Sequence, residues 1–493
     1  MKYKYYMIFI LIFAHTVICH GEEKTLNLLN LDDAIQIASE NSPEIREARL
    51  RFDRNQYLLN AKQAALKSQF SLQLTPYSFS RDRTYNTLFS LWNTNELQES
   101  SAMFMINQPI LWTDGTIQLI NRFSYQEAQS EFSGQDERDK SFNNNLYLSY
   151  NQPIFTYNRT KLELKELKLN LENAALQYAL QNLSLTKSVS QYFYNVYLNK
   201  MRVEIATEEV MNRKASHDII KNKVEAGIAP MEELYQAELD LATSKSSLQN
   251  TTVLLENSLD NLKLLIGMPL DQEISVIEDI SDEKVKIDLG KAISHGKEHR
   301  LEIRQREIDI ETSTFNLIEV ASQNEFVGNL NISYGIIGTD EELRDVYNES
   351  TENQDISISF QVPLWDWGER KSRIAASELD IKSSELMKED ELNSILIGIR
   401  QAFRQVKNQE TQIEIARQNI KNAQLTYEIN LERYKNGDLT SMDLNLFENQ
   451  LSEKKISLVE ALINYKMELL NLKIQSLYDF EKNEPAIPSI EID

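Results

Sequence analysis

The sequence predicts a mainly α-helical protein built from a duplicated unit, with strands of the kind that form a transmembrane β-barrel. Three observations support this fold class. Gly and Pro contribute only 13 and 9 of 493 residues, so long helices meet few breakers. Residues 151–155 and 226–230 recur 210 positions later in the chain. Several segments of about ten residues alternate between apolar and polar side chains, which is typical of strands with two unlike faces.

The composition excludes several classes of protein. The chain has 52 Lys and Arg against 75 Asp and Glu, and its formal net charge of −23 argues against a nucleic-acid coat. A single Cys excludes a disulfide framework and a multi-cysteine zinc site. His295 and His299 stand four residues apart, but without a third ligand they indicate a solvated helix face. With no phosphate loop, nucleophile motif or nucleotide fingerprint, we expect no enzyme, metal site or cofactor.

Residues 1–21 predict a secretory signal peptide. Lys2 and Lys4 precede an apolar run over 7–18, followed by a short cleavage region. Acylation of Cys19, as in a lipoprotein, is the alternative, although the residue before it is not small. After the signal, no apolar run reaches the ~18–20 residues of a membrane-spanning helix. We therefore expect an exported chain.

The duplication keeps a constant offset over more than one element. Pro153 and Pro363 are 210 positions apart, and so are Gly227 and Gly437. The opening helices correspond with an offset of 258, so the first unit carries 48 extra residues before Pro153. A fixed offset of this kind is the mark of a repeated structural unit.

Each repeat is predicted to contain an opening helix, strands, a long helix and a shorter helix. The first repeat spans 22–287, with a helix over 31–69, strands within 70–153, a long helix over 158–225 and a helix over 231–266. Alternation that is rougher than in the second repeat predicts its strands at 70–79, 101–108, 116–125 and 143–152. The second repeat spans 288–478, with a helix over 289–325, strands over 329–362, a long helix over 368–435 and a helix over 440–478. We expect the tail over 479–493 to be disordered.

The strands and the long helices both call for oligomerisation. Leu330, Ile332 and Tyr334 point to one side of a predicted strand, and the polar residues between them point to the other. Four to six strands are too few for a transmembrane barrel, since eight is the smallest known type. Each long helix carries two adjacent apolar rows, which indicates neighbours on both sides. Several copies should therefore share one barrel and one helical wall.

With these features, the chain resembles the TolC family of outer-membrane efflux proteins over residues 25–478. The most specific motifs are Asn151-Gln-Pro-Ile-Phe155, Gln361-Val-Pro-Leu-Trp365, Glu225-Ala-Gly-Ile-Ala-Pro230 and Lys435-Asn-Gly-Asp-Leu-Thr440. The resemblance implies a homotrimer that forms one tube. A shared barrel lies among the lipids of the bacterial outer membrane and continues into an α-helical tunnel in the periplasm. The far end docks on a periplasmic adaptor (membrane fusion) protein and an inner-membrane efflux transporter.

The 48 extra residues depart from the family, which usually supplies four strands per chain. If two added strands join the wall, a trimeric barrel has eighteen strands; if not, they form a hairpin outside it. We expect the outside hairpin.

The resemblance also implies a gate of carboxylates at the helix tips. Asp443 matches an acidic position six residues after Gly437, whereas Leu446 stands where a second acid is common. Glu232 and Glu233 occupy the corresponding stretch of the first repeat. The alternative is that these acids only complement the helix dipole.

The tips are also the implied docking surface for the adaptor. The residues are Gly227, Ile228, Ala229, Pro230, Gly437, Asp438, Leu439 and Thr440. Simple closure of a hairpin is another role for them, and both roles are compatible. Leu439 replaces a basic residue of the family, so the family's lock between protomers is absent or rebuilt. Pro153 and Pro363 mark the implied strand-to-helix junctions.

The implied function is an outer-membrane exit duct of a tripartite efflux system, which passively conducts small molecules. One alternative is the exit duct of a type I protein-secretion system. Another, from a different class, is an exported coiled-coil scaffold or adhesin. The sequence does not specify the exported substrate, because such ducts leave selection to the pump.

Overall fold

The computed structural model describes residues 27–488 apart from 89, 133–134, 278–279 and 281–282, so the predicted signal peptide and Cys19 lie outside the described residues. The chain divides into two compact units, which are described separately. The tip unit comprises Met1–Pro43, Leu185–Lys284 and Asn408–Met467. The sheet unit comprises Glu44–Ser184, Val285–Lys407 and Glu468–Asp493.

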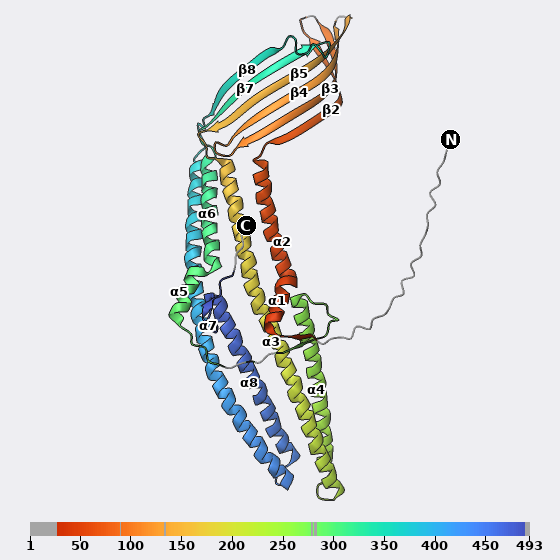
Figure 1. The fold of residues 1–493 in the computed structure, drawn as a ribbon, viewed down its shortest axis with the longest axis vertical. Helices are drawn as coiled ribbons and strands as arrows, with labels where there is room; N and C mark the ends of the chain where they lie inside the picture. Colours follow the sequence, from red (N-terminus) through yellow and green to blue (C-terminus); the bar gives the residue numbers. More distant parts are fainter. Residues whose placement is uncertain (1–26, 89, 133–134, 278–279, 281–282, 489–493) are drawn as a thin grey trace, which may run out of the picture. The chain divides into compact units, whose positions relative to one another are not determined.

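The sheet unit contains one antiparallel sheet of six strands in the order β2-β3-β4-β5-β7-β8 (Figure 1). The strands are β2 (Gln69–Asn86), β3 (Leu91–Ile110), β4 (Gly115–Phe132), β5 (Gln135–Ile154), β7 (Val327–Asp340) and β8 (Thr351–Gln361). All four strands of the first repeat belong to this sheet, so the expectation of a hairpin outside it is wrong. The reason is that β4 pairs with both β3 and β5 along its length, and a separate hairpin would forfeit one of these ladders.

The strands of the first repeat are much longer than the predicted segments. β3, for example, runs over Leu91–Ile110, whereas the alternation predicts 101–108. Towards the hairpin ends both faces of the sheet are polar, and ion pairs cross the strands, as between Arg81 and Glu96 at 3.2 Å. Alternation therefore disappears there while backbone pairing continues.

The single helix predicted over 31–69 is two helices. α1 (Leu31–Asn41) and α2 (Pro43–Ala65) are separated by Ser42, whose ψ is 133°. The break follows from Pro43, because proline disfavours the helical conformation of the residue before it.

The helix predicted over 289–325 is also two, α5 (Leu289–His299) and α6 (Leu301–Ser322). No proline stands here. Instead, Arg300 leaves the helical region with ψ at 125°, and its guanidinium donates to the Ile474 carbonyl at 3.0 Å. A tertiary contact therefore accompanies this break.

The other predicted helices agree with the structure to within two residues at each end. The long helices are α3 (Arg159–Glu225) and α7 (Glu369–Asn436), and the shorter ones are α4 (Met231–Ile266) and α8 (Ser441–Ser476). Among the described residues, every helix is too short or too polar to cross a lipid bilayer.

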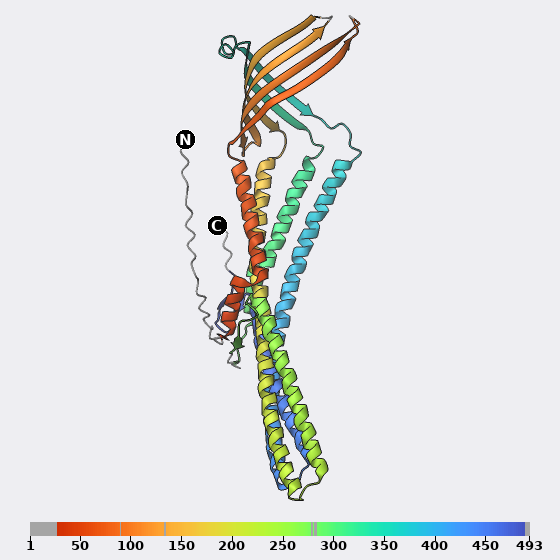
Figure 2. The same cartoon turned by 90° about the vertical axis from the view of Figure 1, so that its right-hand side faces the viewer.

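In the tip unit, α3 with α4 and α7 with α8 form two helical hairpins (Figures 1 and 2). The hairpins share an apolar cluster of Ile220, Ala237, Tyr434 and Leu444. The unit also pairs β1 (Asn27–Leu29) parallel with β6 (Ile274–Val276). In the sheet unit, a second cluster joins α3 to α6 through Leu169, Leu176, Ala179, Leu301 and Ile308.

Part of the tail predicted to be disordered is ordered. β9 (Tyr478–Asp479) and β10 (Glu484–Pro485) form a short antiparallel pair. The buried Asp479 carboxylate accepts a hydrogen bond from Lys473 Nζ at 2.7 Å and bonds from two backbone N–H groups. These bonds fix the start of the tail, while 489–493 lie outside the described residues.

Candidate functional site

Both helical hairpins turn through the same cap. Gly227 and Gly437 have φ values of 72° and 90°, a left-handed conformation that glycine adopts without strain. The Gly227 N–H donates to the Val224 carbonyl at 2.9 Å, and the Gly437 N–H donates to the Tyr434 carbonyl at 3.1 Å. The two tips therefore share one backbone geometry.

The start of the helix after each turn differs. The Thr440 hydroxyl accepts from the Asp443 N–H at 3.2 Å and donates to its carboxylate at 2.7 Å. Pro230, at the same position in the first hairpin, makes no side-chain cap bond. Asp443 therefore stabilises the N-terminus of α8, as the helix-dipole alternative expects.

A hollow of about 380 Å³ lies between the two tips. Its lining includes eight of the predicted tip and gate residues: Ile228, Ala229, Glu233, Gly437, Asp438, Leu439, Thr440 and Asp443. Gly227, Pro230 and Glu232 lie at the first tip but do not line this hollow. The fold thus brings residues that are some 210 positions apart in the sequence into one site.

The hollow also contains residues that sequence reasoning missed, Ile220, Lys223 and Tyr434. The Tyr434 side chain is 1% exposed, and Lys223 Nζ lies 5.3 Å from its ring centroid. Burial raises the pKa of Tyr434 to about 12, and the nearby Glu233 carboxylate adds to the shift. One signal was available: the 210 offset aligns Tyr434 with Val224, so a phenol stands where the first repeat has an aliphatic residue.

A buried ion pair joins the two hairpins further from the tips. Arg213 of α3 is 5% exposed and Glu448 of α8 is 4% exposed, and their closest charged atoms are 3.3 Å apart. Arg213 also donates to Asn449 at 2.9 Å, while one oxygen of Glu448 has no hydrogen-bond partner among the described residues. Burial raises the pKa of Glu448 more than the attraction of Arg213 lowers it. This pair links the two hairpins, and burying its two charges costs desolvation free energy.

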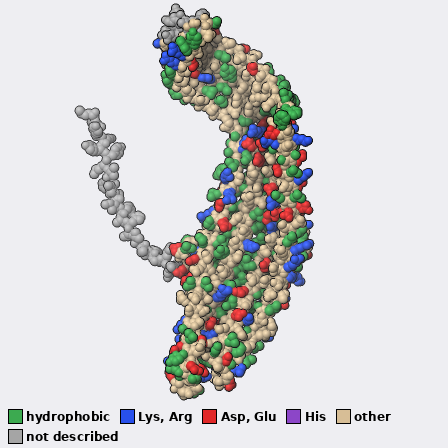
Figure 3. Space-filling view, turned by 180° about the vertical axis from the view of Figure 1, so that it is seen from behind, with side chains coloured by type: hydrophobic (Ala, Val, Ile, Leu, Met, Phe, Trp, Pro, Cys, Tyr) green, Lys and Arg blue, Asp and Glu red, His purple; other side chains and the backbone are tan. Residues whose placement is uncertain are grey.

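One face of the sheet is mainly apolar and the other is mainly polar. Residues that pair directly across an antiparallel sheet lie on the same face. One such row is Phe70, Ile106, Leu119, Leu148, Tyr334 and Gln354, and the next is Gln69, Asn107, Gln118, Ser149, Ser333 and Asp355. On the face seen in Figure 3, charged side chains are dense over the helices and sparse over much of the sheet. An apolar face beside a polar one is what a wall between lipid and water requires.

Aromatic residues gather where the strands meet the helices. Pro153 lies near the end of β5 and Pro363 follows β8, as the motifs predict. Trp365 and Trp367 pack edge to face at 5.5 Å, and Trp367 is 90% exposed. Phe326 stacks on Phe360 with ring centroids 5.5 Å apart. Exposed aromatic side chains at the ends of the strands are typical of a membrane–water interface.

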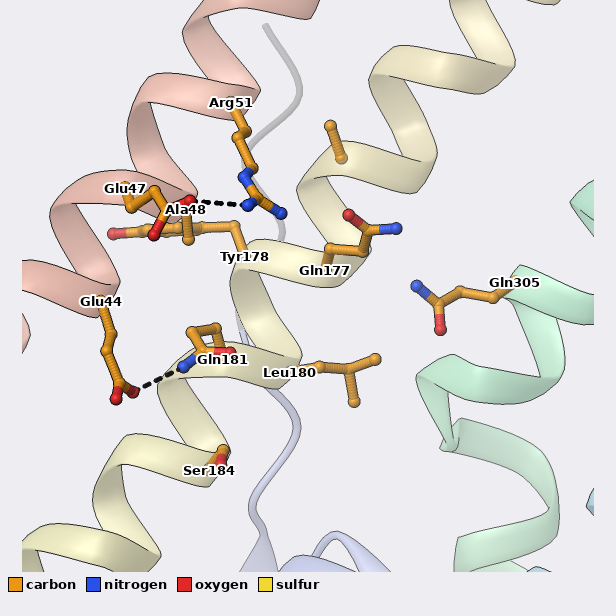
Figure 4. A pocket seen from close by; sticks show the side chains of 11 residues that line it. Glu44, Glu47, Ala48, Arg51, Gln177, Tyr178, Leu180, Gln181, Ser184 and Gln305 are labelled. Carbon is orange, nitrogen blue, oxygen red and sulfur yellow. Dashed lines mark hydrogen bonds and ion pairs between the residues drawn. The ribbon is translucent and has the colours of Figure 1, made fainter.

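A second hollow, of about 570 Å³, lies between α2, α3 and α6 in the sheet unit (Figure 4). Its polar side chains bond one another: Gln181 donates to Glu44 at 2.9 Å, and Arg51 pairs with Glu47 at 2.6 Å. The rings of His295 and His299 contact at a tilt with centroids 4.4 Å apart, and His295 packs edge to face on Tyr478, so this helix face is less solvated than expected. The described residues contain no cluster of three or more His, Cys, Asp or Glu suited to a metal ion.

Comparison with known proteins identifies the family. The sequence matches the outer membrane efflux protein family over residues 34–268 and 294–473, which is most of the chain. Among curated proteins, none matches significantly. The Campylobacter jejuni outer-membrane channel CmeC is 16% identical, with a TM-score of 0.69 over 93% of this chain and 87% of that one.

Two further solved structures share the fold. The Vibrio cholerae outer membrane protein VceC is 14% identical, with a TM-score of 0.66 over 90% of this chain and 96% of that one. The Neisseria gonorrhoeae channel MtrE is 13% identical, with a TM-score of 0.65 over 90% of this chain and 88% of that one. These identities show a common fold, and the family match covers both repeats. The chain therefore belongs to the outer membrane efflux protein family, and it is an outer-membrane protein with a TolC-like fold.

Proposed function

We propose that this chain is the outer-membrane exit duct of a tripartite efflux system and passively conducts small molecules out of the cell. Channels of the family are trimeric and work with adaptor proteins and inner-membrane pumps, which supports a homotrimer here. A passive duct requires a wall and a gate rather than a reactive centre. The sheet with two unlike faces supports the wall, and the helix tips support the gate.

The observation that carries the proposal is the hollow between the tips. It is lined from both hairpins, and it combines apolar Ile228, Ala229 and Leu439 with the acids Glu233 and Asp443. Of these apolar residues Ile228 is exposed, and an exposed apolar side chain at a turn offers a surface to a partner helix. The acids place negative charge beside the same surface, so one small region can both dock a partner and respond to it.

The gate works through charge and packing in this proposal. In a trimer, the acids at three tips repel one another across a narrow opening and favour its widening. Packing opposes this: Tyr434 is buried between the hairpins, with Lys223 beside it. A partner that parts the hairpins would shift this balance towards the open state. Glu232, at the first tip but outside the hollow, adds to the negative field.

Photo-crosslinking from the tip tests the proposal in the native cell. Ile228 is the better site for the reactive residue, because it is 76% exposed whereas Leu439 packs into the apolar cluster. Met211, also exposed and several turns along α3, is the matched control. We expect Ile228 to capture a periplasmic adaptor and Met211 to capture far less.

The identity of the captured partner separates the candidate functions. An adaptor of a drug or metal-ion pump supports efflux, whereas an adaptor of a protein exporter supports the type I secretion duct. Replacing Ala229 with Glu should abolish export while trimers still assemble. Intact trimers that capture nothing, and normal export from the Ala229→Glu variant, would reject docking at the tips and favour the scaffold alternative.

A further inference from the structure

The six-stranded sheet has two unpaired edges within the described residues. β2 pairs only with β3, and β8 pairs only with β7. Every residue of β8 is exposed, and so are the described residues of β2 apart from Thr75. About half of the backbone polar groups of an edge strand point away from its neighbour. In lipid, such groups have to be paired.

The apolar face of the sheet extends to both edges. Three exposed apolar side chains alternate along each edge strand: Phe70, Leu72 and Leu74 on β2, and Ile356, Ile358 and Phe360 on β8. Both edges are therefore inside the apolar band. The sheet cannot close on itself, because six strands are fewer than the eight of the smallest transmembrane barrel. Another copy of the chain has to cover each edge.

We propose that β8 of one copy pairs antiparallel with β2 of the next, and that three copies close an eighteen-stranded barrel, an inference that rests on the proposed trimeric duct. The directions are suitable, since six antiparallel strands leave β2 and β8 running in opposite senses. The contact is head-to-tail, and such contacts close into a ring when the rotation from one copy to the next closes. Eighteen strands depart from the twelve that four strands per chain would supply.

The geometry of the sheet points to one register. A perpendicular row starts at Gln69, the first residue of β2, and reaches Asp355 on β8, six residues before that strand ends at Gln361. If the helix-side ends of the strands stay level around the ring, Gln361 lies opposite Gln69 of the next copy. In that register Asp355 lies opposite Thr75 of the next copy. A perpendicular row that starts at Gln69 of one copy therefore meets the next copy at Thr75, six residues further along β2 after crossing six strands.

This advance of six residues over six strands is the shear of the barrel, and the shear sets the tilt of the strands. One residue of shear per strand is the ratio found in eight-stranded barrels with a tilt of ~36°. That tilt lies in the ~35–45° range of outer-membrane barrels. A register shifted down by two residues would lower the tilt to about 25°, below that range.

Side-chain matching supports the same register. Phe360 lies opposite Phe70, Ile358 opposite Leu72, and Ile356 opposite Leu74, so every apolar residue meets an apolar one. The polar pairs are Ser359 with Ser71 and Ser357 with Gln73. A register shifted up by two residues would instead set Ile356 against Pro76, which has no N–H to donate.

The intermolecular ladder ends where β2 is interrupted. The pairing of β2 with β3 shifts register between Thr75 and Ser78, and Pro76 lies in this bulge. Beyond it, β2 carries Arg81, Asp82 and Arg83. Charges, prolines and bulges are devices by which an edge strand in water avoids further pairing. The shared joint is therefore Gln69–Thr75 against Asp355–Gln361.

The consequence is a wide exit with a polar lumen. Barrel diameter grows roughly linearly with strand number, so eighteen strands give about one and a half times the width of twelve. Barrels of this size hold a water-filled channel. The polar row from Gln69 to Asp355 lines that channel, and any constriction on cargo falls to the helix tips.

Disulfide crosslinking tests both the joint and its register. The only Cys of the chain is Cys19, within the predicted signal peptide, so the sheet is free of cysteine. We expect the double variant Ser71→Cys with Ser359→Cys, oxidised in outer-membrane vesicles, to shift from monomer to covalent trimer on non-reducing gels. Ser71→Cys with Ser357→Cys is the control, because a two-residue shift separates the Cβ atoms too far for a disulfide. Neither single variant should form the trimer.

Thiol labelling of β4 tests whether its strands belong to the wall. Leu119→Cys on the apolar face should react with a lipid-soluble maleimide only, and Gln118→Cys on the polar face with a water-soluble one. Equal labelling of both by the water-soluble reagent would put β4 outside the wall and overturn the eighteen strands. Crosslinking of the control pair in place of the predicted one would overturn the register. If the protein is a trimer but neither pair crosslinks, the shared edge is overturned and the proposed duct is not. If the protein is a monomer, both the shared edge and the proposed duct are overturned.

Discussion

The two helical hairpins of the tip unit have nearly the same backbone and different chemistry. α4 and α8 are each 36 residues long, and both tips turn at a glycine with positive φ. Yet Thr440 caps α8 with its side chain, whereas Pro230 leaves α4 without such a bond. Tyr434 stands where the first hairpin has Val224.

The same asymmetry extends away from the tips. The ion pair between Arg213 and Glu448 joins α3 to α8. The equivalent positions, Ala423 on α7 and Glu238 on α4, cannot form it, and Glu238 is exposed. The duplicated backbone was therefore retained, while this buried ion pair is present in only one of the two equivalent helix pairs. Backbone geometry depends on a few residues such as the tip glycines, whereas side-chain contacts can diverge freely.

The largest expected effect comes from breaking the buried ion pair at one end. Arg213→Gln leaves the Glu448 carboxylate buried without its cation, and we expect it to cost about 3–5 kcal/mol of tip stability. The half-exposed pair of Arg202 with Glu460 is the control, since Arg202→Gln should cost less than about 1 kcal/mol. Hydrogen exchange of the tip amides measures both. Equal costs would mean that burial of the Arg213 pair has no energetic role.

Truncation of matched leucines compares the two hairpins directly. Leu444 is 2% exposed in the apolar cluster, and its repeat equivalent Leu234 is only partly buried there. We expect Leu444→Ala to destabilise the tips by about 2–4 kcal/mol and Leu234→Ala by roughly half as much. The readout is again exchange of the tip amides. A larger loss from Leu234→Ala would reverse the asymmetry described here.

The smallest effect is a dependence of stability on pH. Burial raises the pKa of Glu448 above its ordinary value of 4.5. A carboxyl with a raised folded-state pKa stabilises the fold when protonated, so this contribution is lost as pH rises from 4.5 through the raised pKa. We expect Glu448→Gln to flatten this decline, and Glu238→Gln to leave it intact. An unchanged pH profile in the Glu448→Gln variant would assign the decline to other groups.

Much of the fold follows from local sequence signals. The helices α3, α4, α7 and α8 were predictable because apolar rows, few breakers and the two tip glycines are encoded within each segment. The same holds for the strand-to-helix junctions at Pro153 and Pro363. The family itself was recognisable from the repeat and its motifs. These features need only neighbours in the chain.

The structure decided what depends on distant partners. The fold alone shows that all strands of the first repeat join one sheet, because strand pairing is a relation between segments and alternation marks only the part with unlike faces. The break at Arg300 accompanies a bond to the Ile474 carbonyl, which no local pattern announces. Tyr434 and Lys223 became part of the candidate site only when two hairpins met. The sequence by itself determined the family, the repeat and the helices. Tertiary structure decided the strand count, the composition of the tip hollow and the free edges, since each is a property of segments brought together across the chain.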